Sequence, residues 1–172
     1  MKAASYTVLS VVGNYAEAAS LVLNPGDCTV VDRGGVKRQL VLRCPDGCGE
    51  VLSINLDGRS GPAWSLYQRR GTWSLYPSID KPSGCKSHFI LWRGRVLWCD
   101  GFDVDDEAPD AKLISRIRDL FSTRDSAHYS DLSGELDEIP WEVLAACRSL
   151  VKQGRLHEGE NKQKGTFFAT TS

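Results

Sequence analysis

Short apolar runs alternate with turn residues between residue 6 and residue 99. The runs have the length and the β-branched and aromatic content of strands, and Gly-containing turns such as Asp57-Gly58 and Arg70-Gly71 separate them. One short helix is predicted over residues 16–22. The predicted strands cover residues 6–12, 28–31, 39–42, 51–56, 64–68, 89–92 and 96–98. We therefore expect mainly antiparallel β-structure in this half of the chain.

Helical spacing first appears after an acidic segment, residues 100–110, which contains six Asp and Glu. Such a run is typical of a solvated linker. Within residues 111–122 the apolar positions recur at intervals of three and four and predict one amphipathic helix. This change separates a β-rich domain, residues 1–104, from a second domain, residues 105–172, that begins with the acidic linker.

A second predicted helix begins near Pro140, a residue suited to the first helical turn, and ends at Gly154. Residues 155–157 and 166–170 follow as two strand-like pieces on either side of a polar loop. A helix followed by a hairpin with a long tip is typical of a winged helix. We therefore predict a small winged-helix-like domain at this end, and an α+β fold class for the chain.

The charge balance bears on nucleic-acid binding. The net charge is −1, and residues 105–172 carry nine Lys and Arg against thirteen Asp and Glu. This excess of negative charge opposes binding to phosphate. A basic stripe remains, formed by Arg148, Lys152, Arg155, Lys162 and Lys164. Nucleic acid is therefore a partner left open but not favoured, and a structural or protein-binding winged helix is preferred.

The hydropathy pattern indicates a soluble protein. Hydrophobic residues make up 41% of the chain, which is enough to bury a core. No run approaches the roughly 20 apolar residues of a membrane helix, and the N-terminus lacks the basic flank and apolar run of a signal peptide. We expect a cytoplasmic protein with no membrane partner.

Six cysteines in a chain without an export signal favour metal binding over disulfides. Cys44 and Cys48 flank Pro-Asp-Gly in a turn, which can direct both thiols at one point. Cys85 lies in a second turn with His88 three residues later, and Cys99 ends the last predicted hairpin. The predicted Zn²⁺ ligands are therefore Cys44, Cys48 and Cys85, with either Cys99 or His88 as the fourth.

Either ligand set fills a tetrahedral zinc site and leaves no position for a catalytic water, so the predicted zinc is structural. The two other cysteines, Cys28 and Cys147, lie in strand and helix patterns. We expect both to be buried core residues.

Four segments together resemble a bacterial family of small Cys/His proteins. They are Cys44 to Glu50 (CPDGCGE), Leu75 to Ile79 (LYPSI), Gly84 to Phe89 (GCKSHF) and Arg93 to Cys99 (RGRVLWC). Their order and spacing match the family over residues 25–100. The family is encoded beside ubiquitin-like proteins and their E1-like and E2-like enzymes. Its usual third Cys is replaced here by Asp46, which we do not assign to zinc.

The resemblance implies a role in bacterial ubiquitin-like modification, with the ubiquitin-like protein and its E1-like and E2-like enzymes as partners. It also implies a peptidase that acts on the modifier. A peptidase needs a nucleophile and a base within hydrogen-bond reach. Ser78 and His88 form the candidate dyad, and Ser87 is the other candidate nucleophile.

Two further parts of a peptidase site have candidates. The backbone N–H groups of residues 84–87 are candidate donors to an oxyanion. Asp80 and Asp100 are candidates for a carboxylate that orients the base. Ser78 and His88 also have a non-catalytic interpretation, because a Ser can cap a turn and a His can complete the zinc site.

The first hypothesis is therefore a serine-type peptidase that processes or removes a bacterial ubiquitin-like modifier and contains structural zinc. The alternative is a non-catalytic zinc-binding adaptor of the conjugation pathway, in which His88 replaces Cys99 as a ligand. A weaker third hypothesis is a DNA-binding regulator that acts through the C-terminal domain.

Overall fold

The computed structural model describes residues 2–99 and 108–170. The chain divides into unit 1, Met1–Gly101, and unit 2, Phe102–Ser172. The predicted boundary after residue 104 and most of the predicted acidic linker lie outside the described residues. The described residues contain four α-helices and mainly antiparallel sheets, which confirms the α+β class. No helix in these two ranges is long and apolar enough to cross a membrane.

Unit 1 is built on a four-stranded sheet in the order β1-β2-β3-β4. Its elements are β1 (Thr7–Val12), α1 (Tyr15–Leu21), β2 (Asp27–Arg33), β3 (Val36–Arg43) and β4 (Val51–Asn55). The strand pairs β2/β3 and β3/β4 are antiparallel, but β1 and β2 are parallel. The expectation of hairpins throughout is wrong at this pair, because α1 returns the chain to the end where β1 began.

A second layer of short strands follows in sequence. Its elements are η1 (Gly58–Ser60), β5 (Ser65–Arg69), β6 (Thr72–Tyr76), β7 (Ile79–Asp80), β8 (His88–Trp92) and β9 (Arg95–Trp98). Strands β5 and β6 form a hairpin, and β7-β8-β9 form a three-stranded antiparallel sheet. The sequence pattern predicted the β8–β9 hairpin and β5, and it missed β6 and the two-residue β7.

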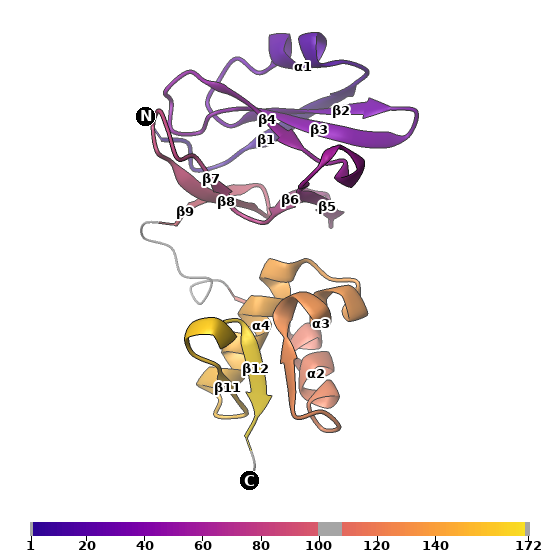
Figure 1. Cartoon of the computed structure of the whole chain (residues 1–172), viewed down its shortest axis with the longest axis vertical. Coiled ribbons are helices and arrows are strands. Elements are labelled where there is room, and N and C mark those ends of the chain that lie inside the picture. The colour runs from indigo at the N-terminus through magenta and orange to yellow at the C-terminus, as the bar shows by residue number, and fades with distance from the viewer. Residues whose placement is uncertain (1, 100–107, 171–172) are drawn as a thin grey trace. The chain divides into compact units, whose positions relative to one another are not determined.

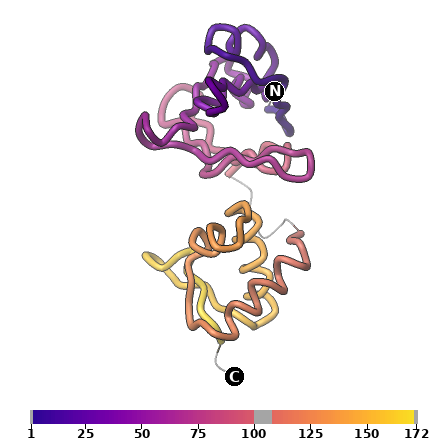
Figure 2. The backbone as a smooth tube through the Cα atoms, turned by 90° about the vertical axis from the view of Figure 1, so that its right-hand side faces the viewer, coloured from indigo at the N-terminus to yellow at the C-terminus, as the bar shows by residue number. Residues whose placement is uncertain are grey.

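The core of unit 1 lies between these layers. In Figure 1, α1 covers one face of the four-stranded sheet and β5 to β9 face the other, and Figure 2 shows the layers from the side. The larger apolar cluster joins the two β layers through buried residues such as Cys28, Leu42, Leu75 and Phe89. A smaller cluster beneath α1 includes Ala18. The burial of Cys28 confirms that it is a core residue.

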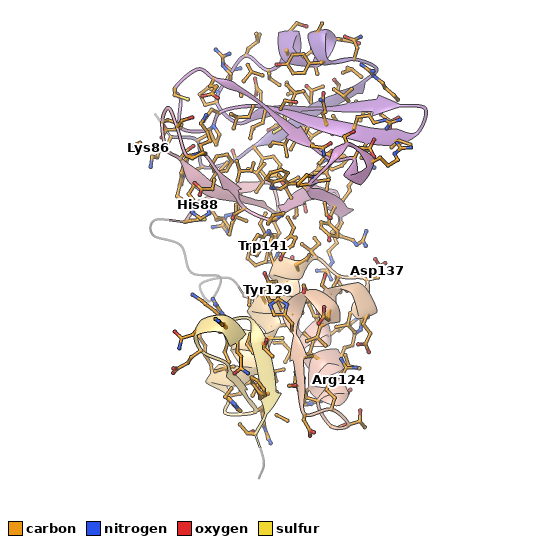
Figure 3. The ribbon with its side chains drawn as sticks, in the orientation of Figure 1. Lys86, His88, Arg124, Tyr129, Asp137 and Trp141 are labelled. Atoms are coloured by element: carbon orange, nitrogen blue, oxygen red, sulfur yellow. The ribbon has the colours of Figure 1, made fainter. Side chains whose placement is uncertain are left out.

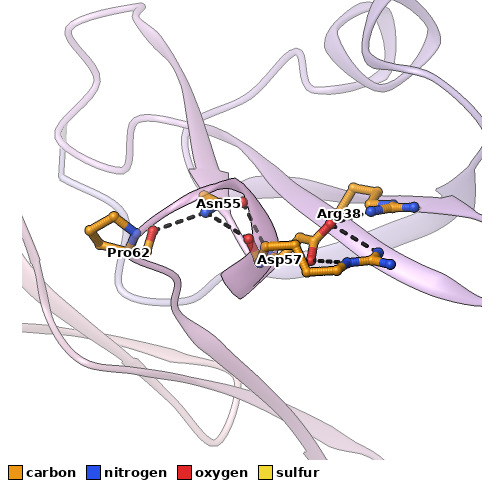
Figure 4. A network of polar contacts seen from close by, with 5 residues as sticks. Arg38, Asn55, Asp57 and Pro62 are labelled. Atoms are coloured by element: carbon orange, nitrogen blue, oxygen red, sulfur yellow. Dashed lines mark hydrogen bonds and ion pairs between the residues drawn. The ribbon is translucent and has the colours of Figure 1, made fainter.

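A polar network fixes the chain where it passes from the sheet to the second layer (Figure 4). The buried Asp57 carboxylate accepts hydrogen bonds from the side chains of Arg38 and Arg59. Asn55 donates its side-chain amide to the backbone carbonyls of Asp57 and Pro62, at 3.1 and 2.9 Å. The segment that leads to β5 is therefore held against the edge of the sheet.

Unit 2 combines three helices with a small sheet. Its elements are α2 (Ala111–Leu120), β10 (Ser126–His128), α3 (Tyr129–Leu136), α4 (Pro140–Lys152), β11 (Leu156–Glu158), η3 (Asn161–Gln163) and β12 (Thr166–Ala169). The three strands form an antiparallel sheet in the order β10-β12-β11. The sequence pattern predicted α2, α4 and the β11–β12 hairpin, and it missed β10 and α3.

The helices of unit 2 are amphipathic and pack through their apolar faces. Leu113 and Ile117 of α2 are buried, as are Cys147 and Leu150 of α4 and Phe167 of β12. Asp110 caps α2 by accepting from the backbone N–H groups of Lys112 and Leu113. The complete burial of Cys147 confirms its expected place in the core.

Candidate active site and metal centre

Ser78 and His88 meet at the edge of the β7-β8-β9 sheet. Ser78 immediately precedes β7, and His88 is the first residue of β8. The strands pair with Asp80 opposite His88, so Ser78 is the diagonal neighbour of His88 on the same face. Ser78 Oγ lies 3.1 Å from His88 Nε2, which is hydrogen-bonding distance. The structure therefore brings the two predicted dyad residues into contact. Figure 3 labels His88 and also Lys86, which lies two residues earlier in the chain.

The backbone of Ser78 is held by a tryptophan. The indole Nε1–H of Trp64 donates to the carbonyl oxygen of Ser78 at 3.2 Å. Trp64 is itself anchored, because its backbone N–H donates to the carbonyl of Asn55 at 2.8 Å and its ring packs against the core of unit 1. A short chain of contacts therefore joins the Asp57 network to Ser78.

The loop between β7 and β8 places Cys85 beside the dyad. It is closed by a hydrogen bond from the Lys81 N–H to the Ser87 carbonyl at 3.0 Å. Gly84 and Lys86 both have left-handed backbone, with φ of 68° and 52°, and so the chain reverses sharply at Cys85. The loop therefore carries a candidate metal ligand directly before the candidate base, His88.

Three of the predicted zinc ligands form one cluster. The sulfur atoms of Cys44, Cys48 and Cys85 all lie within 4.8 Å of one another. Cys44 follows β3 and is buried, Cys48 is exposed in the turn, and Cys85 is half-buried. The thiols come from segments about 40 residues apart in sequence, with Cys44 Sγ and Cys85 Sγ 3.7 Å apart.

This spacing fits a zinc ion. Two thiolates bound to one tetrahedral Zn²⁺ at about 2.3 Å lie about 3.8 Å from each other. The backbone N–H groups of Asp46 and Ser87 donate to the sulfur atoms of Cys44 and Cys85, and this stabilises thiolates. Donor type, spacing and hydrogen bonding therefore suit a soft divalent ion at Cys44, Cys48 and Cys85.

The thiols differ in their ionisation. Burial raises the pKa of Cys44 to about 12, and a hydrogen bond from the Asp46 N–H opposes that rise. The pKa of Cys85 is lowered, chiefly because the Ser87 hydroxyl donates to its sulfur. Cys85 therefore becomes a thiolate more readily than Cys44, whose charge is stabilised once a cation is bound.

The predicted fourth ligand is not in this cluster. Neither Cys99 nor His88 belongs to the group of three thiols among the described residues. Cys99 directly follows β9 and donates its backbone N–H to the carbonyl of His88 at 3.0 Å, so it lies beside the same loop. The Nε2 atom of His88 faces Ser78 instead of the thiols.

The other candidate nucleophile, Ser87, faces the metal cluster. Its hydroxyl is buried and lies 3.2 Å from Cys85 Sγ and 3.8 Å from Cys44 Sγ. Its N–H donates to Cys85, and the N–H of Lys86 donates to the Ser83 carbonyl at 3.4 Å. The backbone N–H groups of residues 84–87 are the predicted oxyanion donors, and those of Lys86 and Ser87 already have acceptors. Gly84 and Cys85 are left as candidate donors.

A buried lysine lies beside the thiols. Lys81 is 9% exposed, and its Nζ forms an ion pair of 2.5 Å with the carboxylate of Glu50. The Glu50 carboxylate raises the pKa of Lys81, and the charges of Cys85 and Cys44 raise it further. A lysine ammonium group, paired with Glu50, therefore lies next to the cluster that a metal would leave anionic.

The two predicted orienting carboxylates have different positions. Asp80 lies directly opposite His88 in the β7–β8 register and is exposed. Asp100 lies outside the described residues. The register therefore places Asp80 beside His88.

Comparison with known proteins matches the part of the chain that holds this site. Residues 15–99 match the family model BubE, a bacterial ubiquitination-like system serine protease. The BubE match spans Ser78, His88 and all four candidate zinc cysteines, and unit 2 lies outside it. It supports the predicted link to a bacterial ubiquitination-like system. Searches of curated proteins and of solved structures found no match.

Sequence reasoning missed three residues that support the site. Trp64 begins one of the predicted strands, and its donor role depends on a carbonyl 14 residues later. Lys81 and Glu50 lie 31 residues apart and carry no motif that marks them as a buried pair. The local signals for the site came from the Cys44 turn, the Pro-Ser segment and the Cys-Lys-Ser-His segment.

Proposed function

We propose that this chain is a serine-type peptidase that processes or removes a bacterial ubiquitin-like modifier. The observation that carries the proposal is the 3.1 Å contact between Ser78 Oγ and His88 Nε2. The BubE match over residues 15–99 supports the reaction class and the pathway. Partners of such an enzyme are the ubiquitin-like protein and its E1-like and E2-like enzymes.

The chemistry follows from the dyad. His88 Nε2 accepts the hydroxyl proton as Ser78 Oγ attacks the scissile carbonyl carbon. The protonated imidazole then donates that proton to the leaving amine, which leaves an acyl ester on Ser78. Water, deprotonated by His88, attacks the ester carbonyl carbon. The ester C–O bond then breaks, the imidazolium returns its proton to Ser78 Oγ, and the carboxyl product is released. Asp80, opposite His88, is the proposed group that orients the imidazole.

The proposed role of zinc is structural. Cys44, Cys48 and Cys85 would hold it, and Cys99 is the proposed fourth ligand because its backbone lies beside His88. A bound zinc ion would supply rigid cross-linking between the turn after β3 and the loop that precedes His88. The cysteines would thereby fix the position of the base against Ser78.

We also propose that unit 2 is a winged-helix domain. Its element order of helix, strand, two helices and a two-stranded hairpin, with β10 paired to β12, supports this assignment. Arg148 of the predicted basic stripe forms an ion pair with Glu158 at 3.1 Å. This pairing argues against the DNA-binding hypothesis and favours a structural or protein-binding role.

Covalent labelling with a fluorophosphonate tests the proposal. The wild-type chain is expected to be labelled at Ser78, and His88→Ala should lower the labelling rate about 10²–10⁴-fold, as for loss of a general base. Ser83→Ala and His157→Ala are matched controls and should react normally. Labelling of Ser87 would identify Ser87, and not Ser78, as the nucleophile. Labelling of no serine while zinc is bound would favour the adaptor hypothesis instead.

A further inference from the structure

Unit 2 contains a cavity that is separate from the Ser78–His88 site. Its volume is about 360 Å³. Its apolar floor includes Phe121 from the end of α2, Leu150 of α4 and Leu156 of β11, which are all buried. Arg118 and Arg155 line the same cavity and are both exposed. The site therefore combines an apolar interior with two guanidinium groups.

These arginines differ from the other three in the domain. Arg116, Arg124 and Arg148 each form an ion pair with a glutamate at 3.0 or 3.1 Å. Arg118 has only a 3.6 Å contact with the exposed Asp119 and a hydrogen bond to Ser115. In the described part of the chain no carboxylate pairs with Arg155. The two arginines without a glutamate partner are thus the two that line the cavity.

The hydroxyl groups of the cavity restrict what it can bind. Ser122 Oγ already donates to the carbonyl of Asp119 at 2.6 Å. Thr170 Oγ1 already donates to the carbonyl of Arg155 at 2.9 Å. Both oxygens are therefore left as acceptors, and the guanidinium groups are the donors. A matching ligand offers a carboxylate, N–H donors and an apolar group.

We propose that this cavity binds an acidic peptide segment, with an apolar side chain on the floor and an adjacent carboxylate on Arg118 and Arg155. A peptide supplies amide N–H donors for the two hydroxyl oxygens and an apolar side chain for the floor, whereas a phosphate ion has no apolar group. Arginine pairs with carboxylates through two parallel hydrogen bonds, which gives the contact a defined direction. The site lies in unit 2, so its test measures binding and does not depend on peptidase activity.

The test is a titration of the full-length ¹⁵N-labelled chain, followed by amide chemical shifts. The probes are acetyl-Glu-Leu-Glu-amide and two analogues, one with Gln for both Glu and one with Ser for Leu. The acidic apolar peptide should shift the amides of Phe121, Leu150 and Ala169 in a saturable way, and each analogue should bind at least about tenfold more weakly. The double variant Arg118→Gln/Arg155→Gln should bind the acidic peptide at least about tenfold more weakly than the wild type does.

The control Lys112→Gln/Lys162→Gln removes the same charge from exposed positions outside the cavity and should bind like the wild type. The proposal is overturned if the acidic peptide leaves the three amides unshifted, or if the arginine variant and the lysine control bind equally. It is also overturned if inorganic phosphate or a short DNA duplex shifts these amides more strongly than the peptide does.

Discussion

The indole N–H of Trp64 donates to the carbonyl oxygen of Ser78 at 3.2 Å. This contact is made to the backbone of the proposed nucleophile itself, and it ties the residue before β7 to the segment that the Asp57 network anchors. The position of Ser78 Oγ relative to His88 therefore depends on Trp64, which precedes β5 and lies 14 residues before Ser78 in the sequence. Trp64 is a positioning residue, because it touches the backbone of Ser78 and not the reacting atoms.

Trp64→Phe is expected to lower kcat of cleavage up to about tenfold, since a single hydrogen bond contributes about 0.5–1.5 kcal/mol. KM and zinc content should remain unchanged. Trp73→Phe is the matched control, because Trp73 packs against the same core without donating to Ser78. Steady-state kinetics on both variants check this. Equal losses in kcat would show that ring size, and not the hydrogen bond, matters.

Removal of one proposed zinc ligand should impair the Ser78–His88 dyad indirectly. Cys85→Ser is expected to lose most bound zinc and most cleavage activity, because the loop before His88 is no longer fixed to the turn after β3. Cys147→Ala removes a buried thiol from unit 2 and should keep one zinc per chain. Metal analysis by atomic emission, together with cleavage assays, checks both. Retention of full zinc by Cys85→Ser would contradict the proposed ligand set.

The Lys81 ammonium should strengthen zinc binding. Three thiolates and one Zn²⁺ carry a net charge of −1, and a fourth thiolate makes it −2, so an adjacent buried cation stabilises the complex. Lys81→Met is expected to weaken zinc binding about tenfold or more in competition with a chelator. Lys86→Met, in the same loop but exposed, is the control. No difference between the two variants would rule out this role for Lys81.

Asp57 should make unit 1 sensitive to acid. Hydrogen bonds from Arg59 and Arg38 hold its pKa well below the usual range. Because the folded-state pKa is lowered, the stabilisation is present above the unfolded pKa of about 3.9 and is lost as the pH falls below it. Asp57→Asn should thus be less stable than wild type at pH 7, and the two unfolding free energies should converge in acid.

Denaturant unfolding at a series of pH values measures this difference. Asp32→Asn is a suitable control, because Asn can also accept the hydrogen bond that Gly35 donates to Asp32 in its turn. A difference between wild type and Asp57→Asn that persists unchanged at pH 3 would show that the carboxylate charge is not responsible.

Local patterns predicted much of the fold and part of the site. Apolar alternation marked β2, β3, β4 and β8, and the Cys44 turn and the Cys85 loop marked the thiol cluster. The pattern missed α3, because this helix has only eight residues, contains Gly134, a weak helix former, and buries only Leu132 and Ser133. It also missed the parallel pairing of β1 with β2, which depends on how α1 packs and not on either strand.

Contacts between distant residues account for the rest. The Ser78–His88 dyad could be predicted as a pair of residue types, but their 3.1 Å separation depends on the β7–β8 register. β7 contains only two residues and gives no periodic signal. The support from Trp64, and the charge that Lys81 places beside the thiols, likewise follow from tertiary packing.

Cleavage of a ubiquitin-like fusion protein tests the central claim most directly. Zinc content and cleavage are measured together for wild type, Ser78→Ala, His88→Ala and the control Ser83→Ala, with the cognate modifier as the fused substrate. The account predicts that Ser78→Ala and His88→Ala keep one zinc per chain and lose cleavage, while Ser83→Ala retains both. Loss of zinc from His88→Ala, with no cleavage by the wild type, would contradict the peptidase and identify His88 as a metal ligand of an adaptor.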